Sequence, residues 1–387
     1  MDRSESSKHG MTPESSISAG FSTLAASASA MERGDLDEVV VLTTELIESG
    51  YLSEQGIAVA HYQRGLAFCR KKLYECAIED FNEAIRFDPE FARAYYHRGY
   101  VCRKTGRTGH AIENYNRAIR LDPEFVPAYI NRGAIHIDEG LYYHAIQDFH
   151  QAIRLAPDHP RVYSDRGCAF YGNGRYDRAL EDFNEALKLD PAFTLAHLHR
   201  GHVFCATGCF DQAIDAYTQA LGLDPKFALA YKNRAHVYFY QSRFSEAGTD
   251  YSKYVELRAE DIPALIMWHL AHARAGENGD AALARQAQGI DITTWPGAAV
   301  AMFLGNLTPQ EMLVQARADG ETIKNDGRHL GFFYAGEYYL LQGRTTDAVE
   351  MFRQAILDGA NDCFEHTFAE AELERLGVSV LIPRERR

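Results

Sequence analysis

The sequence predicts an all-α fold, an α-solenoid of stacked helical hairpins with a helical C-terminal extension. Its main signal is a 34-residue period, which is typical of repeats that bury their apolar faces against their neighbours. Prolines recur at this interval, at Pro89, Pro123, Pro157, Pro191 and Pro225. Upstream glycines keep the same spacing, at Gly65, Gly99, Gly133, Gly167 and Gly201.

Other columns of the period predict how each hairpin packs. Alanine recurs at Ala77, Ala111, Ala145, Ala179 and Ala213, and again at Ala84, Ala118, Ala152, Ala186 and Ala220. We expect the glycine and the first alanine to lie where the two helices of a hairpin cross, because a larger side chain there would push the helices apart. Aromatic residues fill the groove beside them, at Phe81, Tyr115, Phe149, Phe183 and Tyr217. The proline then ends the second helix.

These columns resemble the signature of the tetratricopeptide repeat (TPR). The register gives six repeats, at residues 58–91, 92–125, 126–159, 160–193, 194–227 and 228–261. The sixth repeat departs from the pattern, since Ala235 replaces the glycine, Tyr254 the second alanine and Ala259 the proline.

Helical segments are also expected on both sides of this array. Residues 1–18 are serine-rich and predicted to be disordered, and residues 19–57 to form a hairpin of helices 21–33 and 35–48. Residues 262–328 are predicted to be an irregular helical connector, with helices over 263–275 and 280–288 and a helix start at Thr308 and Pro309. Residues 329–377 form a TPR-like hairpin, with Gly336 and Phe352 in register, plus a capping helix over 367–376. Residues 378–387 form a tail.

The C-terminal region has a second, more particular resemblance. Four short motifs follow one another in this order: Trp295-Pro296, FLGN at 303–306, FFYAGEYYLLQGR at 332–344 and AELERLG at 371–377. This order resembles the C-terminal half of NlpI-like bacterial TPR proteins, over residues 290–377. The resemblance implies a helical adaptor, with a homodimer as one possibility, like relatives that bring cell-wall hydrolases and a processing protease together in the cell envelope.

Composition narrows the classes of partner and location. The net charge of −14 over 387 residues, without a compensating basic run, argues against nucleic acid as a partner. No apolar run is long enough for a membrane span, and no secretory signal is visible. Seven scattered cysteines fit free thiols in a reducing compartment. These features favour a cytoplasmic protein, the alternative being a periplasmic one whose export signal is missing from this sequence.

The sequence contains no recognisable catalytic or phosphate-binding motif. We therefore expect a non-catalytic scaffold or adaptor without a cofactor, which binds a protein or peptide in its concave groove. The alternative is an NlpI-like envelope adaptor for cell-wall hydrolases and a processing protease.

The resemblance to TPR proteins places the ligand groove on the first helix of each repeat. In this sequence the matching positions provide an aromatic floor with a basic edge. Such a surface suits a peptide that has an apolar anchor beside acidic residues. The alternative is that the N-terminal hairpin packs on these aromatic side chains and closes the groove there. The candidate binding residues are Tyr62, Leu66, Arg93, Tyr96, His97, Tyr100, Arg103, Lys104 and Asn131. Of the residues required for the TPR clamp that binds chaperone C-termini, only Asn131 and Arg161 are present, so a chaperone carboxylate is not the expected ligand.

Two further side-chain groups have a structural and a functional interpretation. An arginine precedes each glycine position, at Arg64, Arg98, Arg132, Arg166, Arg200 and Arg234. We interpret this column as a structural ladder paired with acids such as Asp80, Asp148 and Asp182, and not as a grip for an acidic ligand. Histidines and a cysteine at His199, His202, Cys205 and His236 could bind a soft metal ion, but their spacing matches no standard site, so no metal is expected.

Overall fold

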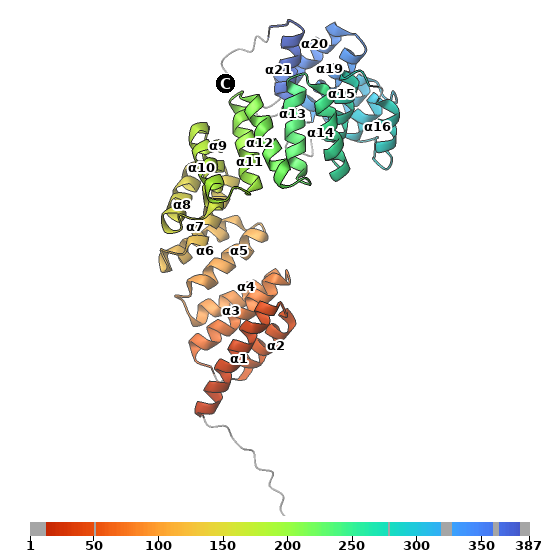
Figure 1. Cartoon of the computed structure of the whole chain (residues 1–387). Coiled ribbons are helices and arrows are strands. Elements are labelled where there is room, and N and C mark those ends of the chain that lie inside the picture. Colours follow the sequence, from red (N-terminus) through yellow and green to blue (C-terminus); the bar gives the residue numbers. More distant parts are fainter. Residues whose placement is uncertain (1–12, 50–51, 278, 319–326, 359–363, 380–387) are drawn as a thin grey trace, which may run out of the picture. The chain divides into compact units, whose positions relative to one another are not determined.

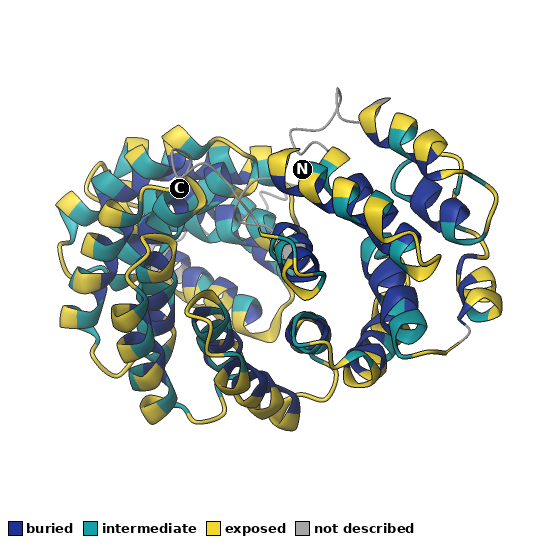
Figure 2. Ribbon diagram, turned by 90° about the horizontal axis from the view of Figure 1, so that it is seen from above, coloured by how far each residue is buried: buried dark blue, intermediate teal, exposed yellow. Residues whose placement is uncertain are grey.

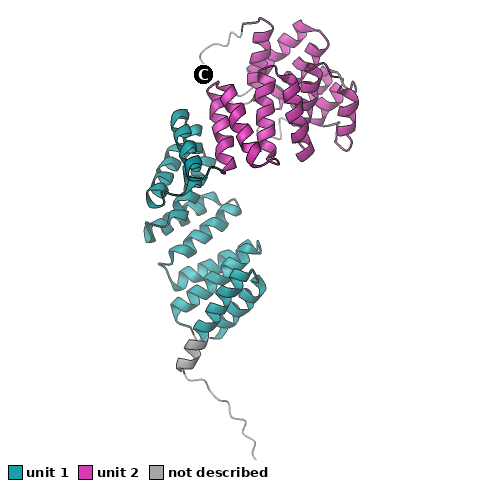
Figure 3. Ribbon diagram, viewed as in Figure 1, with its two compact units in different colours: residues 1–191 teal, residues 192–387 magenta. Residues whose placement is uncertain are grey.

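The computed structural model describes residues 13–49, 52–277, 279–318, 327–358 and 364–379. These residues form twenty-one helices and no strand (Figure 1). The chain divides into two compact units, residues 1–191 and 192–387, here called the N-terminal and C-terminal lobes (Figure 3). The predicted all-α solenoid is therefore confirmed, and each lobe is described by itself.

The N-terminal lobe is a stack of antiparallel helix pairs. Neighbouring helices pack in chain order, so that each pair lies against the next. Its helices are α1 (Pro13–Arg33), α2 (Leu36–Ser49), α3 (Glu54–Arg70), α4 (Tyr74–Phe87), α5 (Ala92–Lys104), α6 (Thr108–Leu121), α7 (Val126–Asp138), α8 (Tyr142–Leu155), α9 (Pro160–Gly172) and α10 (Tyr176–Leu189).

The crossing of each hairpin has the predicted geometry. A Cβ atom placed on Gly133 would lie 2.9 Å from Cζ of Phe149, the aromatic residue of the same repeat. The same relation joins Gly65 to Phe81 at 2.8 Å and Gly167 to Phe183 at 2.7 Å. Because real Cβ atoms do not approach other atoms so closely, a larger residue at these three positions would force the aromatic ring or the helix to shift.

A second glycine column forms the turn inside the hairpins. Gly106, Gly140, Gly174 and Gly208 have positive φ values between 70° and 75°. In the first of these turns the amide of Arg107 donates to the carbonyl of Cys102 at 2.8 Å. This bond closes the first helix in a Schellman-type turn, in which glycine adopts the left-handed conformation without steric cost.

The N-terminal boundary differs from the prediction. Helix α1 begins at Pro13, so residues 13–18 are helical and not disordered as expected; residues 1–12 lie outside the described residues. Proline is favoured in the first turn of a helix, because its fixed φ suits the helix and its missing amide hydrogen has no intrahelical partner there. The serine content of this segment concealed that start.

The C-terminal lobe continues the pairing and then encloses a larger core. Its helices are α11 (Thr194–Ala206), α12 (Phe210–Leu223), α13 (Ala228–Tyr240), α14 (Phe244–Leu257), α15 (Ile262–Arg274), α16 (Asp280–Gln286), α17 (Gly297–Phe303), α18 (Pro309–Ala318), α19 (Arg328–Leu341), α20 (Thr345–Asp358) and α21 (Phe364–Arg375). Along the helices buried and exposed faces alternate, as Figure 2 shows. A single apolar cluster runs from α13 and α15 to α21.

Two local features of this lobe follow the sequence closely. A Cβ atom on Gly336 would lie 2.5 Å from Cε1 of Phe352, the relation found in the regular repeats. Helix α18 begins with a capping box, because the amide of Glu311 donates to the Thr308 hydroxyl at 3.3 Å and the Glu311 carboxylate accepts from the Thr308 amide at 2.8 Å. Helix α21 packs against α20 and α19 and reaches α13.

Candidate functional site

The candidate groove lies on the first helices of the N-terminal lobe. Tyr62 and Leu66 lie on α3, whereas Tyr96 and Tyr100 lie one turn apart on α5. All four side chains are half-buried. Tyr62, Leu66 and Tyr100 pack against a core formed by Ala77, Phe81 and Val101. The aromatic residues thus form a fixed floor, each with part of its surface open to solvent.

The N-terminal hairpin covers another part of α3. Val59 packs with Leu24 and Leu46 of α1 and α2, in a cluster separate from the tyrosine floor. The buried residues around Tyr62 and Tyr100 come from α4 and α5. This arrangement favours an open floor over the alternative in which the N-terminal hairpin covers the aromatics.

A hydrogen bond joins the floor of the first repeat to the second. Nδ1 of His97 lies 2.9 Å from the carbonyl oxygen of Arg93 and 3.2 Å from the hydroxyl oxygen of Tyr62. Since a carbonyl only accepts, Nδ1 carries the proton and donates to both oxygens. Burial lowers the pKa of His97 and raises the pKa of Tyr62 to about 12, so both side chains are neutral at pH 7.

The same link recurs one repeat further on. The Asn131 side-chain amide on α7 donates to the hydroxyl of Tyr96 at 2.7 Å. The Tyr96 ring also meets Phe125 edge-on, with 5.1 Å between centroids. Asn131 and Tyr96 are therefore brought together as a pair, and this contact between repeats was not expected from the sequence.

The basic edge of the groove is smaller than predicted. Arg93 and Lys104 are exposed, and the Lys104 ammonium lies 5.5 Å from the centre of the Tyr100 ring. Arg103, in contrast, donates to the carboxylate of Asp138 on α7 at 2.9 Å. Its charge is thus paired across two repeats, which leaves Arg93 and Lys104 as the cations available to a ligand.

Sequence reasoning missed Asp165 on α9, in the fourth repeat. It occupies the position that holds His97 and Asn131 in the second and third repeats. Burial raises the pKa of its carboxyl group, and Nε of Arg161 lies 3.6 Å away. The signal was available, because residues 97, 131 and 165 are 34 apart, but this column is polar and variable and so does not stand out.

Four of the six arginines in the column pair with an aspartate, as interpreted, namely Arg64, Arg132, Arg166 and Arg234. Arg166 donates from Nε and Nη2 to the two carboxylate oxygens of Asp182 at 2.8 and 2.7 Å. Equivalent two-point bonds join Arg64 to Asp80 and Arg234 to Asp250. Arg132 bonds Asp148 and also reaches Asn116 of α6, so the arginine connects the second helices of adjacent repeats.

The metal candidates of the C-terminal lobe engage other partners. Nε2 of His202 accepts from the side-chain amide of Asn233 at 2.7 Å, and the Cys205 thiol lies 3.4 Å from the Tyr217 hydroxyl. His236 is buried against Phe368 of α21. Burial lowers the pKa of His199 and His202 to about 4. Within the described part of the chain, no three His, Cys, Asp or Glu side chains gather as a metal site.

We therefore expect protein purified without an affinity tag to contain no stoichiometric zinc or copper. The reason is that His202 is already hydrogen-bonded through one ring nitrogen, and among the residues that the structure describes no third ligand accompanies the pair His199 and His202. Elemental analysis of the untagged protein measures this directly. About one metal ion per chain, lost on His202→Ala, would contradict the expectation.

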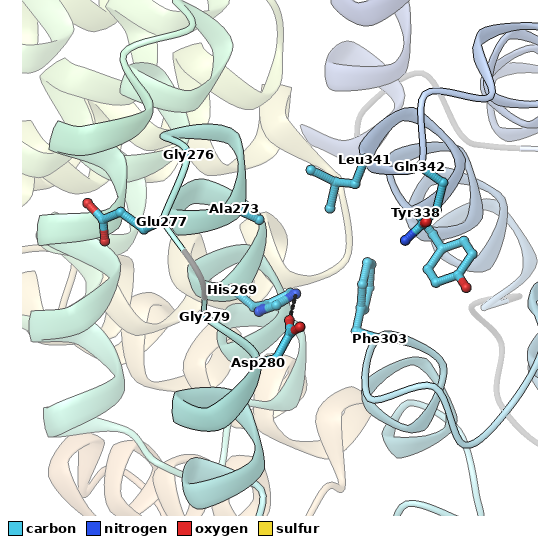
Figure 4. A pocket seen from close by; sticks show the side chains of 10 residues that line it. All are labelled: His269, Ala273, Gly276, Glu277, Gly279, Asp280, Phe303, Tyr338, Leu341 and Gln342. Atoms are coloured by element: carbon cyan, nitrogen blue, oxygen red, sulfur yellow. Dashed lines mark ion pairs between the residues drawn. The ribbon is translucent and has the colours of Figure 1, made fainter.

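The C-terminal lobe also contains a pocket of about 350 Å³ between α15, α16, α17 and α19 (Figure 4). His269 is 3% exposed and its Nε2 lies 3.9 Å from the Asp280 carboxylate, while its ring packs near Phe303. Burial lowers the pKa of His269. The ten lining residues include the carboxylates of Glu277 and Asp280 and the phenol of Tyr338, but no serine, threonine, cysteine or lysine.

Stacked helical hairpins, each in contact with its neighbours, define the class of α-solenoid repeat proteins. Sequence profiles described as tetratricopeptide repeat match residues 131–193, 164–225 and 198–262, and profiles described as TPR repeat match 65–106 and 99–140. Together they span residues 65–262, about half of the chain. The chain belongs to the tetratricopeptide-repeat proteins.

Solved structures have the same fold. A tetratricopeptide repeat protein from Parabacteroides merdae is 17% identical with a TM-score of 0.53, covering 66% of this chain and 99% of its own. The C-terminal part of a TPR repeat-containing protein from Cytophaga hutchinsonii is 18% identical with a TM-score of 0.51, covering 63% and 98%. A chain of the APC/C hetero-tetramer Cut9–Hcn1 is 21% identical with a TM-score of 0.51. The match covers 63% of this chain and 48% of the Cut9–Hcn1 chain. At these identities the likeness concerns the fold.

Proposed function

We propose that this protein is a non-catalytic interaction scaffold, which binds a segment of a partner protein in the groove of its N-terminal lobe. The observation that carries the proposal is the half-buried tyrosine floor on α3 and α5, held in place by bonds between repeats. Rigid aromatic side chains supply contact area at little cost in conformational entropy. The repeat family to which the chain belongs supports an interaction role.

The charges beside the floor define the partner's chemistry. Arg93 and Lys104 are exposed at the groove, whereas the protein as a whole carries a net charge of −14. A partner segment with an apolar anchor and flanking acidic residues would match both features, because the anchor contacts the tyrosines and the acids meet these cations. Asp165, two repeats away, would disfavour a second acidic group at that end of the groove.

The alternative is an envelope adaptor of the NlpI-like kind. It rests on the motifs at residues 295–377. As a separate finding, the described residues include no helix long and apolar enough to span a membrane. We propose a cytoplasmic location because seven scattered cysteines suit a reducing compartment. Fractionation of native cells, with the protein detected in the soluble cytoplasmic or the envelope fraction, decides between the two.

Charge reversal at the groove edge provides the test of the proposed function. Arg93→Glu combined with Lys104→Glu is expected to slow association with the partner about 10-fold or more at low salt, because exposed charges act mainly on the encounter rate. The difference from wild type should shrink as ionic strength rises. Surface plasmon resonance against the isolated partner measures both rates.

The matched control is Arg120→Glu with Lys188→Glu, which changes the charge equally at exposed positions on the second helices α6 and α10. This control should associate like wild type. Equal slowing by both double variants would indicate a general effect of net charge and would remove the support for the groove.

A further inference from the structure

Two of the six steps of the arginine ladder have no aspartate at the matching position, because Asn114 stands opposite Arg98 and Ala216 opposite Arg200. The side-chain hydrogen bonds of Arg98 go to amide oxygens. Four other arginines of the ladder each form a hydrogen bond to an aspartate in the second helix of their own repeat. Arg98 forms the equivalent bond to the amide side chain of Asn114. Its Nε donates to Oδ1 of Asn114 at 2.8 Å, and its Nη1 donates to Oδ1 of Asn82 on α4 at 2.6 Å. Both acceptors are neutral amides, so the charge of Arg98 is not compensated by these partners.

Comparison with other steps shows what this substitution does. The hydrogen bond to Asp182 raises the pKa of Arg166, and that to Asp80 raises the pKa of Arg64. The pKa of Arg98 is instead lowered by burial, and no carboxylate opposes that effect. Nη2, which grips the second carboxylate oxygen in the other steps, has no hydrogen-bond acceptor among the described residues near Arg98.

A second cation contacts the same aromatic ring as Arg98. The guanidinium of Arg117 on α6 lies 5.7 Å from the centre of the Tyr95 ring, and that of Arg98 lies 5.3 Å from the same ring centre. Arg117 forms no ion pair with any residue that the structure describes; Glu113, one turn earlier on α6, is exposed and does not reach it. Two guanidinium groups therefore share one aromatic ring without an acidic partner.

We propose that Arg98 and Arg117 form a binding site for one oxyanion group, presented to the α4–α6 surface by a bound protein. The unoccupied Nη2 of Arg98 and the donors of Arg117 would bond its oxygens, in the charge-assisted geometry that arginine forms with carboxylates and phosphates. This surface lies among the second helices, since both acceptors of Arg98 belong to α4 and α6. The site is thus separate from the tyrosine groove and goes beyond the proposed function.

The sharpest test replaces Asn114 with the aspartate that other repeats contain. In Asn114→Asp, a built-in carboxylate should occupy the donors of Arg98 and weaken oxyanion binding at least 10-fold. The probes are inorganic phosphate and acetate, each titrated at constant ionic strength with chloride as the balancing anion. Binding is measured as saturable shifts of the arginine Nε–Hε NMR signals, assigned by Arg98→Gln and Arg117→Gln.

The control is Asn116→Asp, two residues further along α6, which adds the same charge beside Arg132, where Asp148 is already present. Wild type and Asn116→Asp should both show saturation at the Arg98 and Arg117 signals. Tighter binding of phosphate assigns the site to a phosphoryl group, and equal or tighter binding of acetate assigns it to a carboxylate. Absence of saturation by either anion in wild type, or equal affinity in Asn114→Asp, would overturn the proposal.

Discussion

Gly133→Leu is expected to lower the free energy of unfolding by about 1–3 kcal/mol or more, because overpacking a close helix crossing forces side chains and backbone to move. The Cβ atom alone would lie 2.9 Å from Cζ and 3.0 Å from Cε1 of the Phe149 ring. That ring is fully buried, in an apolar cluster that includes Ala145 and Ala152. Since repeats stabilise their neighbours, the loss should extend beyond the third repeat.

Thermal and urea unfolding of the full chain, followed by far-UV circular dichroism, measures this effect. Gly109→Leu is the control, because Gly109 is an exposed helical glycine and its Cβ would meet nothing within 4 Å. The control should unfold close to wild type. If Gly133→Leu melted like Gly109→Leu, the register assigned to the repeats would be wrong.

The double variant Tyr96→Ala with Tyr100→Ala is expected to abolish capture of the main partner. Truncating an aromatic anchor at the centre of an interface commonly costs about 2 kcal/mol or more in binding, and this variant removes two from one helical face. Tyr96 packs against Phe125 and accepts a bond from Asn131, so some stability will also be lost.

The control must therefore lose stability without touching the groove. Ile112→Ala truncates a residue of α6 that packs against the core beside Tyr96. Isothermal titration calorimetry with the isolated partner, below the melting temperature of all variants, separates binding from folding. Retained affinity in the tyrosine variant, or equal losses in both variants, would contradict the role of the tyrosines as anchors.

The sequence predicts contacts inside a repeat better than contacts between repeats. Gly133 and Phe149 belong to columns that recur every 34 residues, so their pairing is visible as a pattern. The arginine–aspartate ladder is visible for the same reason. Arg103 and Asp138, in contrast, form a single ion pair that does not recur in the other repeats, and no periodic signal marks it.

The candidate site shows the same limit. Tyr62, Tyr96 and Tyr100 could be placed on one face from helical spacing alone, and the structure places them on α3 and α5 with part of each ring exposed. Their bonds to His97 and Asn131 depend on side-chain orientation across two helices, which spacing does not determine. The missing carboxylate at Asn114 was readable in the sequence, but its meaning depends on what surrounds Arg98.

Site-specific photo-crosslinking tests the central claim most directly, namely that the partner binds the groove of the N-terminal lobe. A photoreactive amino acid is placed at Lys104, which is exposed beside Tyr100, or at Val314, which is 64% exposed on α18 within the NlpI-like region. The partner captured by the full chain is then crosslinked and identified by mass spectrometry. The account predicts crosslinks from position 104 and few from position 314. Crosslinks from position 314, with none from position 104, would contradict it and place recognition in the C-terminal lobe.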